Sequence, residues 1–224
     1  MNWKETNLGF EAELPGALFF FGKKEANLKN LASAYPDLRW SRIRQTHSDI
    51  TIESPSTWPE PWPEADGHWT KTENLALLIS TADCTPVLFY SQKQRVVSAV
   101  HAGWRGVANR IVPKTAALLA GQGFTISDVF LGPHIEMASF EVEAPVRDQL
   151  VAASTACEPY RPGAPGKFHV SLLQILREQL SEAPIARTPR IMELNFDTKT
   201  DLRFHSFRRD REKSGRQLSF VVLR

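Results

Sequence analysis

The apolar residues of this chain occur in short runs, and no unbroken run exceeds five residues. The three longest runs occupy residues 17–21, 75–79 and 116–120. A membrane-spanning helix needs about 20 apolar residues, so we expect no membrane span. Runs of this length, bounded by glycine, proline and polar residues, are typical of the short buried strands and amphipathic helices of a globular protein.

The charges of the chain are almost balanced, with 27 Lys+Arg and 25 Asp+Glu in 224 residues and a formal net charge of +2. This balance argues against nucleic acid or an anionic membrane as the main partner, because both attract a surplus of basic residues. The two cysteines, Cys84 and Cys157, are too few for a disulfide framework. The first residues carry no apolar stretch behind a basic one. We therefore expect a cytoplasmic protein.

Strand and helix patterns alternate irregularly along the chain. Strands are predicted at residues 17–21, 38–44, 50–53, 74–80, 86–90, 95–100, 129–131, 191–194 and 217–223. Helices are predicted at residues 24–35, 106–121, 145–153 and 171–180. Residues 54–66 are rich in proline and form a loop, whose Trp58 and Trp62 are expected to pack on the body or over a cleft. The pattern favours one α+β or mixed α/β domain over residues 1–224 rather than a regular βαβ array.

Two predicted strands share one design, in which an apolar segment runs into a turn of small and polar residues. Residues 75–79 lead into Ser80-Thr-Ala-Asp-Cys84, and residues 96–100 lead into His101-Ala-Gly-Trp-Arg-Gly106. Ligands bind at the carboxyl ends of strands in open α/β sheets. In the second turn, glycines would let backbone N–H groups approach an anion at a helix N-terminus, with Arg105 adding charge.

Cys84, His101 and His47 are the residue types that hold a catalytic zinc ion with one open position. Their separations of 37 and 17 residues match no local metal-binding signature. The residues alone leave two alternatives open: Cys84 as a small core residue, and Cys84 as a nucleophile with His101 as its base. A basic segment at residues 202–216 is interrupted by aromatic residues and could present arginine to a phosphate.

Several segments resemble one protein family when they are taken in order. These are Gln45-Thr-His-Ser48, Thr81-Ala-Asp-Cys-Thr-Pro86, His101-Ala-Gly-Trp-Arg-Gly106, Gly132-Pro-His-Ile135, and Ser206-Phe-Arg-Arg-Asp210 with Gly215-Arg216. The chain resembles, from about residue 38 to its C-terminus, the family once described as multicopper polyphenol oxidase or laccase and now as purine nucleoside phosphorylase/adenosine deaminase. Its bacterial members include a peptidoglycan editing factor.

The resemblance implies one domain with back-to-back mixed β-sheets flanked by helices, in α/β/β/α layers. It implies a metal held by His47, Cys84 and His101, usually zinc, with copper as the other candidate. The implied activities are phosphorolysis of adenosine, inosine, guanosine and 5′-methylthioadenosine, and deamination of adenosine. The implied partners are a purine nucleoside and phosphate, and the protein is expected to be a monomer or weak homodimer.

Within this resemblance, Asp83, Cys84 and His101 are the expected catalytic residues, with Asp83 assigned to proton transfer. The candidates for binding substrate or phosphate are Arg44, Ser48, Arg105, Arg208 and Arg216. The chain departs from the family after its first predicted strand, where the usual arginine and glycine pair is replaced by Phe21-Gly-Lys-Lys24. Lys23 would keep the charge of that arginine but not its fork geometry.

Two other functions are alternatives: a hydrolase that edits a peptidoglycan precursor, and a metal-binding protein with reduced activity. Multicopper oxidation is disfavoured, because six histidines and two cysteines are too few for several copper ions together with the ligands above.

Overall fold

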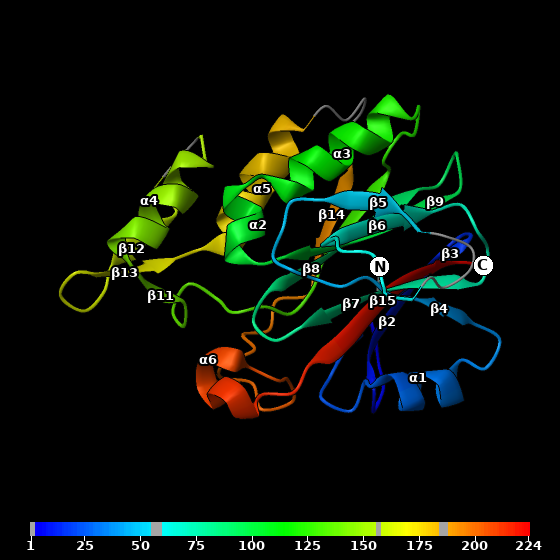
Figure 1. Cartoon of the computed structure of the whole chain (residues 1–224), viewed down its shortest axis with the longest axis horizontal. Helices are drawn as coiled ribbons and strands as arrows, with labels where there is room; N and C mark the ends of the chain where they lie inside the picture. The colour runs from blue at the N-terminus through cyan, green and yellow to red at the C-terminus, as the bar shows by residue number, and fades with distance from the viewer. Residues whose placement is uncertain (1–2, 55–59, 156–157, 184–187) are drawn as a thin grey trace.

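Strands β7 (Leu75–Thr81) and β8 (Thr85–Ser91) are separated by only three residues, yet they belong to different sheets. The computed structural model describes residues 3–54, 60–155, 158–183 and 188–224. In these residues, two six-stranded sheets pack back to back (Figure 1). The turn that carries Cys84 is therefore the point at which the chain passes from one sheet to the other.

The first sheet has the strand order β1-β2-β3-β15-β7-β4, and β4 pairs with β7 in parallel while the other pairs are antiparallel. Its other strands are β1 (Lys4–Glu5), β2 (Gly9–Leu14), β3 (Ala17–Gly22), β4 (Arg39–Ser41) and β15 (Gln217–Leu223). The second sheet has the order β14-β10-β8-β9-β6-β5, with parallel pairs at both edges. Its other strands are β5 (Thr51–Glu53), β6 (Gly67–Thr70), β9 (Val96–Ala102), β10 (Asp128–Leu131) and β14 (Arg190–Glu193).

Alternation of side chains along the strands builds the core between the two sheets. From the first sheet, Phe19, Leu77 and Val221 point inward and meet Leu88 and Phe130 of the second. The rings of Phe19 and Phe130 stack with their centroids 3.9 Å apart. Apolar residues on the opposite faces of these strands need a separate cover, which helices supply.

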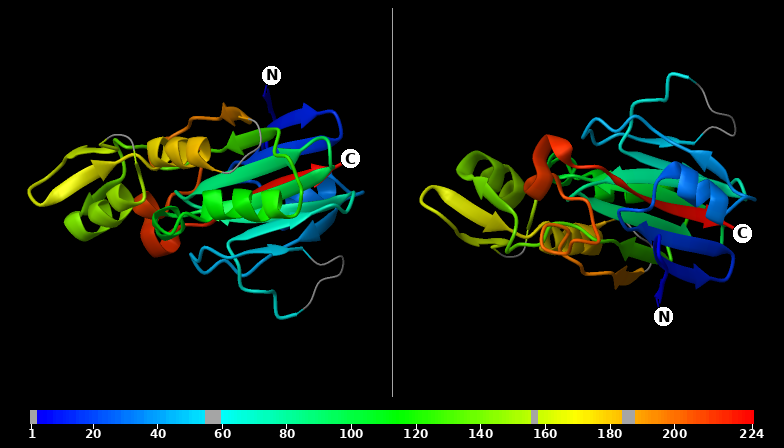
Figure 2. Two further views of the ribbon diagram at one scale, coloured as in Figure 1. Left: turned by 90° about the horizontal axis from the view of Figure 1, so that it is seen from above. Right: turned by 90° about the horizontal axis from the view of Figure 1, so that it is seen from below.

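Three helices cover the outer faces of the sheets (Figure 2). Helix α1 (Leu28–Ala34) packs its buried Leu31 on the first sheet. Helices α3 (Ile111–Gly121) and α5 (Leu172–Glu182) pack on the second sheet and on each other's side chains. The α/β/β/α layering implied by the resemblance is therefore confirmed.

A predicted helix over residues 106–121 is in fact two helices, α2 (Trp104–Ala108) and α3. The chain breaks at Arg110, whose φ of 61° lies in the left-handed region and cannot continue a helix. Pro113 is the third residue of α3, where its missing N–H has no helical partner to lose.

A smaller unit projects from one end of the molecule and was not predicted as a sheet (Figure 1). It combines helix α4 (Ala144–Ala152) with a third sheet of order β11-β13-β12. These strands are β11 (Glu141–Glu143), β12 (Tyr160–Pro162) and β13 (Lys167–Val170). The guanidinium of Arg147 lies over the rings of Tyr160 and Phe168, at 5.1 and 3.9 Å from their centroids, and joins the helix to the sheet.

The basic C-terminal segment folds into a short helix, α6 (Phe207–Asp210), followed by a 3₁₀ turn, η1 (Arg211–Lys213). Trp58 and Cys157 lie outside the described residues. In the described part of the chain, we find no helix with the length and apolarity that crossing a membrane requires.

Candidate metal centre

Three side chains predicted as metal ligands lie together at one end of the two packed sheets. The ligand atoms of His47, Cys84 and His101 all lie within 4.8 Å of one another. We call these three residues the ligand cluster. It is the single group of its kind that we find among the described histidines, cysteines and carboxylates. His47 follows β4, Cys84 joins β7 to β8, and His101 lies in β9, so both sheets contribute.

The orientation of His101 is set by Asp66, a fully buried residue just before β6. The Nδ1 atom of His101 lies 2.7 Å from Asp66 Oδ1. A carboxylate can only accept here, so Nδ1 donates and Nε2 is left for a metal. The backbone N–H of His101 also donates to the carbonyl of Asp66, at 2.7 Å. Asp66 therefore fixes both the ring and the main chain of this ligand.

Asp66 also holds the loop that carries His47. Its carboxylate accepts hydrogen bonds from the backbone N–H groups of Thr46, His47 and Ser48 at 3.0, 3.1 and 2.6 Å. The Ser48 hydroxyl donates to the same carboxylate at 2.8 Å. His47 has a φ of 61°, an uncommon conformation for a residue with a side chain. These hydrogen bonds from successive N–H groups explain how the loop keeps that conformation.

Gly103 leaves the space that the ligand cluster occupies. A Cβ atom on Gly103 would lie 3.0 Å from His47 Cδ2, 3.1 Å from Cys84 Sγ and 3.5 Å from His101 Cε1. A side chain at this position would therefore press on His47 and Cys84 and touch His101. The convergence of ligand atoms around this space, together with one thiolate and two imidazoles as donors, fits a zinc-type or copper-type site.

The surroundings of Cys84 favour its thiolate. Partial burial would raise the pKa of the thiol, but the charge of His101 and hydrogen bonds from both histidines outweigh it, and the pKa falls to about 6. Burial likewise opposes the charged form of His101, but the Cys84 thiolate and Asp66 raise the pKa of His101 to about 9. The site is therefore built to stabilise a negative sulfur atom, which is the form that binds metal.

The ligand cluster lies in a cavity of about 710 Å³. Four of the predicted substrate or phosphate residues line it, as does Asp83: Arg44, Arg105, Arg208 and Arg216. Ser48 is not among the lining residues, and its backbone N–H and hydroxyl donate hydrogen bonds to Asp66 instead. Lys23 is engaged elsewhere, because its Nζ lies 2.7 Å from Glu5 Oε1 and 2.7 Å from the Thr6 carbonyl oxygen.

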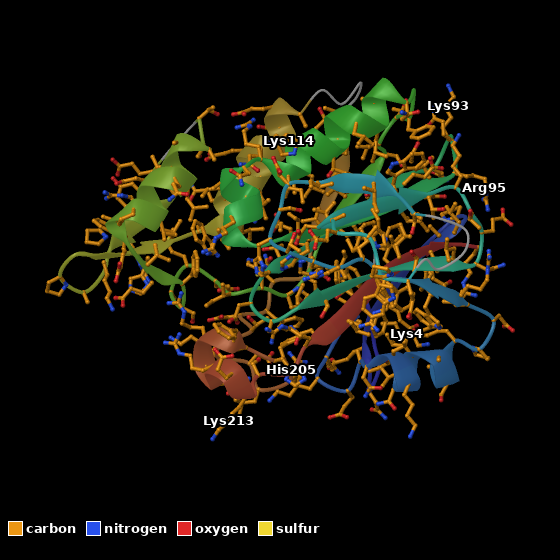
Figure 3. All side chains as sticks on the ribbon, viewed as in Figure 1. Lys4, Lys93, Arg95, Lys114, His205 and Lys213 are labelled. Atoms are coloured by element: carbon orange, nitrogen blue, oxygen red, sulfur yellow. The ribbon has the colours of Figure 1, made fainter. Side chains whose placement is uncertain are left out.

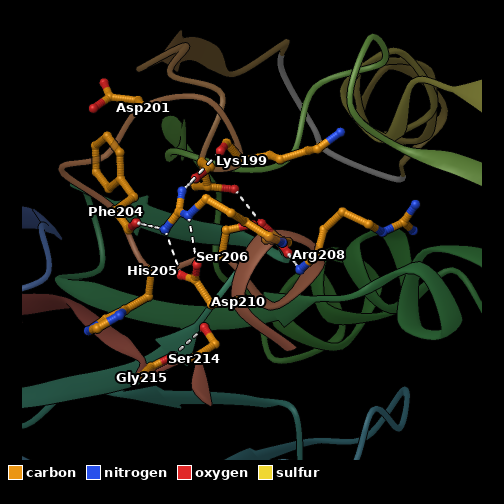
Figure 4. A network of polar contacts seen from close by, with 12 residues as sticks. Lys199, Asp201, Phe204, His205, Ser206, Arg208, Asp210, Ser214 and Gly215 are labelled. Carbon is orange, nitrogen blue, oxygen red and sulfur yellow. Dashed lines mark hydrogen bonds and ion pairs between the residues drawn. The ribbon is translucent and has the colours of Figure 1, made fainter. Parts of the chain in front are cut away.

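Asp83 connects the ligand cluster to the C-terminal segment. Its Oδ1 accepts a hydrogen bond from Thr198 Oγ1 at 2.7 Å, and its Oδ2 accepts one from the backbone N–H of Arg208 at 2.6 Å. The Arg208 side chain extends away from Asp210 and Phe204 (Figure 4). The neighbouring Arg209 is held by Asp210 at 2.8 Å and by nearby backbone carbonyls. The two adjacent arginines thus differ in position: Arg208 lines the cavity, whereas Arg209 is bound within the C-terminal segment.

Several residues that build the site were not found from the sequence. Asp66 lies directly before a strand, and its hydrogen bonds reach residues about twenty positions earlier, so no local pattern marks it. Arg42 and Arg211 line the cavity but belong to no motif quoted above. Gln45 does belong to one, and its amide exchanges two hydrogen bonds with the backbone of Ser80, both 2.8 Å. These bonds attach the His47 loop to β7.

Comparison with known proteins places the chain in a family. A family model described as multi-copper polyphenol oxidoreductase laccase matches residues 23–224. The Pseudomonas aeruginosa protein named purine nucleoside phosphorylase PA4543 is 34% identical over 190 residues, which cover 84% of this chain and 75% of that protein. A Haemophilus influenzae protein named purine nucleoside phosphorylase is 31% identical over 182 residues, or 80% of this chain and 72% of that one.

The fold has a close counterpart among solved structures. YlmD from Geobacillus stearothermophilus superposes with a TM-score of 0.89 at 24% identity, over 99% of this chain and 98% of that chain. The family model covers the whole second sheet, the residues that line the cavity and the ligand cluster, and it begins just after β3 of the first sheet. The chain therefore belongs to the family described as multi-copper polyphenol oxidoreductase laccase, and among its relatives are proteins named purine nucleoside phosphorylase.

Proposed function

We propose that this protein is a zinc-dependent purine nucleoside enzyme that cleaves adenosine, inosine, guanosine and 5′-methylthioadenosine with phosphate and also deaminates adenosine. One observation carries the proposal: three converging metal-ligand atoms lie in a cavity whose walls are lined with arginine. The names of the relatives support a phosphorylase. Copper remains the other candidate metal, in keeping with the description of the family.

In phosphorolysis, a phosphate oxygen forms a bond to C1′ of the ribose while the bond from C1′ to the base nitrogen breaks. The base leaves with the electron pair and takes up a proton, so the products are the free base and the 1-phosphate of the sugar: ribose 1-phosphate, or 5-methylthioribose 1-phosphate from 5′-methylthioadenosine. We assign the binding of the phosphate to cavity arginines, because guanidinium groups match phosphate oxygens in pairs. Four arginines that were expected from the sequence to bind phosphate line the cavity: Arg44, Arg105, Arg208 and Arg216.

We assign proton transfer to Asp83. It is 8% exposed and lines the cavity next to Cys84. Each of its carboxylate oxygens accepts one hydrogen bond, and each has a second lone pair to offer. Its φ of 80° is sterically costly for a residue with a side chain, and such positions concentrate at functional sites.

His47, Cys84 and His101 would hold the metal, and Asp66 would orient His101 and the His47 loop. Zinc held by these residues would supply an acidified water, which is the chemistry that deamination at C6 of adenine needs. Deamination exchanges the C6 amino group for oxygen and releases ammonia, and it needs no phosphate. The two reactions are therefore separable by their dependence on phosphate.

The test is product analysis of protein purified without added metal, then loaded with zinc. Adenosine is incubated with the protein in the presence and absence of phosphate, and the products are separated. We expect adenine only when phosphate is present, and inosine also without it. The absence of product from adenosine, inosine and guanosine with metal-loaded protein would contradict the proposal. The metal-site variant Cys84→Ala serves as the inactive control.

A further inference from the structure

The cavity contains more positive charge than its own carboxylates can balance. Six arginines line it: Arg42, Arg44, Arg105, Arg208, Arg211 and Arg216. Asp83 is the one carboxylate in the described lining, and both of its oxygens already accept hydrogen bonds. Arg44 pairs with Glu64 at 3.1 Å. Among the described residues, the other five have no ion pair, and we call them the unpaired cavity arginines.

Four of these five side chains lie near aromatic rings, and two of the four also donate to backbone carbonyls, Arg208 to Glu141 and Arg216 to Ser214 and Gly215. Arg42 lies over Trp62 at 4.2 Å and Arg105 over Trp104 at 4.4 Å from the ring centroids. Two longer contacts, of 5.3 and 5.8 Å, pair Arg208 with Phe140 and Arg216 with Phe207. All four rings also line the cavity. A ring orients a guanidinium without neutralising it, so the charge stays available to a ligand.

Outside the ligand cluster, the positive charge that lines the cavity is carried by arginine. No lysine is among the described lining residues, and Lys93 and Lys213 lie at the periphery of the molecule (Figure 3). Arginine remains charged even when it is partly buried, and its planar fork matches phosphate. Burial and the charge of Arg211 lower the pKa of Arg208, and the charges of Asp83 and Glu141 offset only part of this decrease. Arg208 and Arg211 thus repel each other, and an anion bound between them would relieve that repulsion.

Arg211 adds an independent observation. Its φ of 52° and ψ of −132° are unfavourable for any residue with a side chain, and glycine would relieve the strain. Its guanidinium is exposed, lines the cavity and has no hydrogen-bond partner among the described residues. Arginine here therefore contributes nothing to local packing that would compensate its backbone, which points to a role toward a ligand.

We propose that this cavity binds purine nucleosides that carry their own phosphate, that is, purine nucleoside monophosphates, more tightly than the uncharged nucleosides. The inference rests on the proposed function, since it assumes that the purine nucleoside binds in this cavity. One free phosphate carries a charge of about −1.5 to −2 near neutral pH, which leaves several guanidinium groups without a counter-charge. The guanidinium planes and the rings beside them can also stack on a base.

The test is equilibrium binding in phosphate-free buffer at low ionic strength, by isothermal titration calorimetry. The probes are adenosine, adenosine 5′-monophosphate, ribose 5-phosphate and inorganic phosphate. We expect the monophosphate to bind at least about tenfold more tightly than adenosine and than either phosphate probe, because a charged hydrogen bond contributes roughly that factor. We also expect the preference over adenosine to shrink as salt is added. Equal affinity for adenosine and its monophosphate would overturn the inference, and so would equal affinity for the monophosphate and inorganic phosphate.

Variants locate the effect. Arg105→Gln and Arg211→Gln are each expected to reduce the preference for the monophosphate by about tenfold. Arg211→Gly relieves the backbone strain while removing the charge, so a loss of preference in that variant does not come from added backbone strain. Arg161→Gln, at an exposed position in β12 of the projecting unit, is the matched control and should keep the full preference. A preference that survives all substitutions in the cavity would contradict the inference.

An assay of adenosine phosphorolysis on the same preparation separates the two proposals. If adenine is released with phosphate but the monophosphate shows no preference, the further inference fails and the proposed function stands. If the monophosphate is preferred but no purine nucleoside is cleaved or deaminated, the proposed function fails and only the ligand class holds.

Discussion

The ligand cluster and the unpaired cavity arginines share one cavity, but they are held in opposite ways. Asp66 is fully buried and accepts hydrogen bonds from His101 and from three successive backbone N–H groups of the His47 loop. Four of the five unpaired cavity arginines instead lie near aromatic rings, and none of the five has a carboxylate partner among the described residues. Hydrogen bonds within the protein thus orient the ligand cluster before a metal binds. The charge of the unpaired cavity arginines, in contrast, is left for a ligand to balance.

Asp66→Asn tests whether Asp66 orients the ligand cluster, and this substitution has the largest expected effect. Loss of the carboxylate removes the acceptor for His101 Nδ1 and weakens the anchor of the His47 loop. We expect metal affinity to fall by about 10- to 100-fold, as with other residues that orient metal ligands. Competition with a chromophoric chelator measures the affinity.

The control for Asp66→Asn is Asp128→Asn. Asp128 is also buried, at 2% exposure, but it pairs with Arg190 at 2.6 Å in the second sheet, away from the cavity. This variant should lose stability and keep its metal affinity. Equal losses of metal affinity in both variants would show that Asp66 acts through general stability rather than by orienting the ligands.

A second test uses the pH dependence of stability and a buried histidine of the second sheet. His68 of β6 is fully buried, and burial lowers its pKa to about 3. The unfolded chain takes up this proton near pH 6.5 while the folded protein does not, so stability falls as the pH drops below 6.5 toward 3. Between pH 6 and pH 5, the unfolding equilibrium constant should rise about eightfold through this residue. Denaturant unfolding of the parent and of His68→Gln at each pH measures this equilibrium constant. The same pH dependence of stability in the two proteins would contradict the prediction.

Gly103→Ala tests how closely the chain fits the cluster. The added methyl group would lie 3.0 Å from His47 and 3.1 Å from Cys84, so the ligands must shift by a few tenths of an ångström. We expect metal affinity to fall by about fivefold, less than when a hydrogen-bond partner of a ligand is lost. Gly121→Ala, where a Cβ meets no atom within 4 Å, should bind metal as the parent does. Unchanged affinity in Gly103→Ala would refute the tight fit.

The smallest effect is expected for the one ion-paired arginine of the cavity. Arg44 and Glu64 are both largely exposed, so their ion pair is weak, but it partly neutralises the arginine. Arg44→Gln should weaken the binding of inorganic phosphate about twofold, and less than Arg105→Gln does. Phosphate titrations at one ionic strength compare the two variants. A larger loss of phosphate affinity in Arg44→Gln than in Arg105→Gln would contradict the prediction that unpaired arginines contribute more to binding.

Much of the fold was accessible from the sequence, because its longest strands are apolar and bounded by clear turn residues. The strand predicted at residues 217–223 is β15 without change, and the strand at 129–131 is one residue short of β10. The helix predicted at 106–121 failed because a single left-handed residue, Arg110, divides it. The third sheet was missed because its strands are three or four residues long and mostly polar.

The site was only partly accessible. Spacing alone did not select His47, Cys84 and His101, and their grouping came from a resemblance of motifs that the structure brings to one place. Asp66 accepts hydrogen bonds from backbone N–H groups of residues about twenty positions earlier in the chain. Every residue type except proline has such an N–H group, so the sequence does not reveal these partners. Arg208 and Phe140 belong to segments far apart in the chain, so this pair becomes visible only in the fold, whereas Arg105 and Trp104 are neighbours in the sequence.

The most direct test of the central claim is the metal content of the purified protein and of Cys84→Ala, measured by mass spectrometry of the metal. Cys157→Ala, which removes the other cysteine, is the control. One metal ion per chain in the parent and in Cys157→Ala, with loss of that ion in Cys84→Ala, is the predicted result. Full metal content in Cys84→Ala, or several metal ions per chain in the parent, would contradict a single site formed by His47, Cys84 and His101.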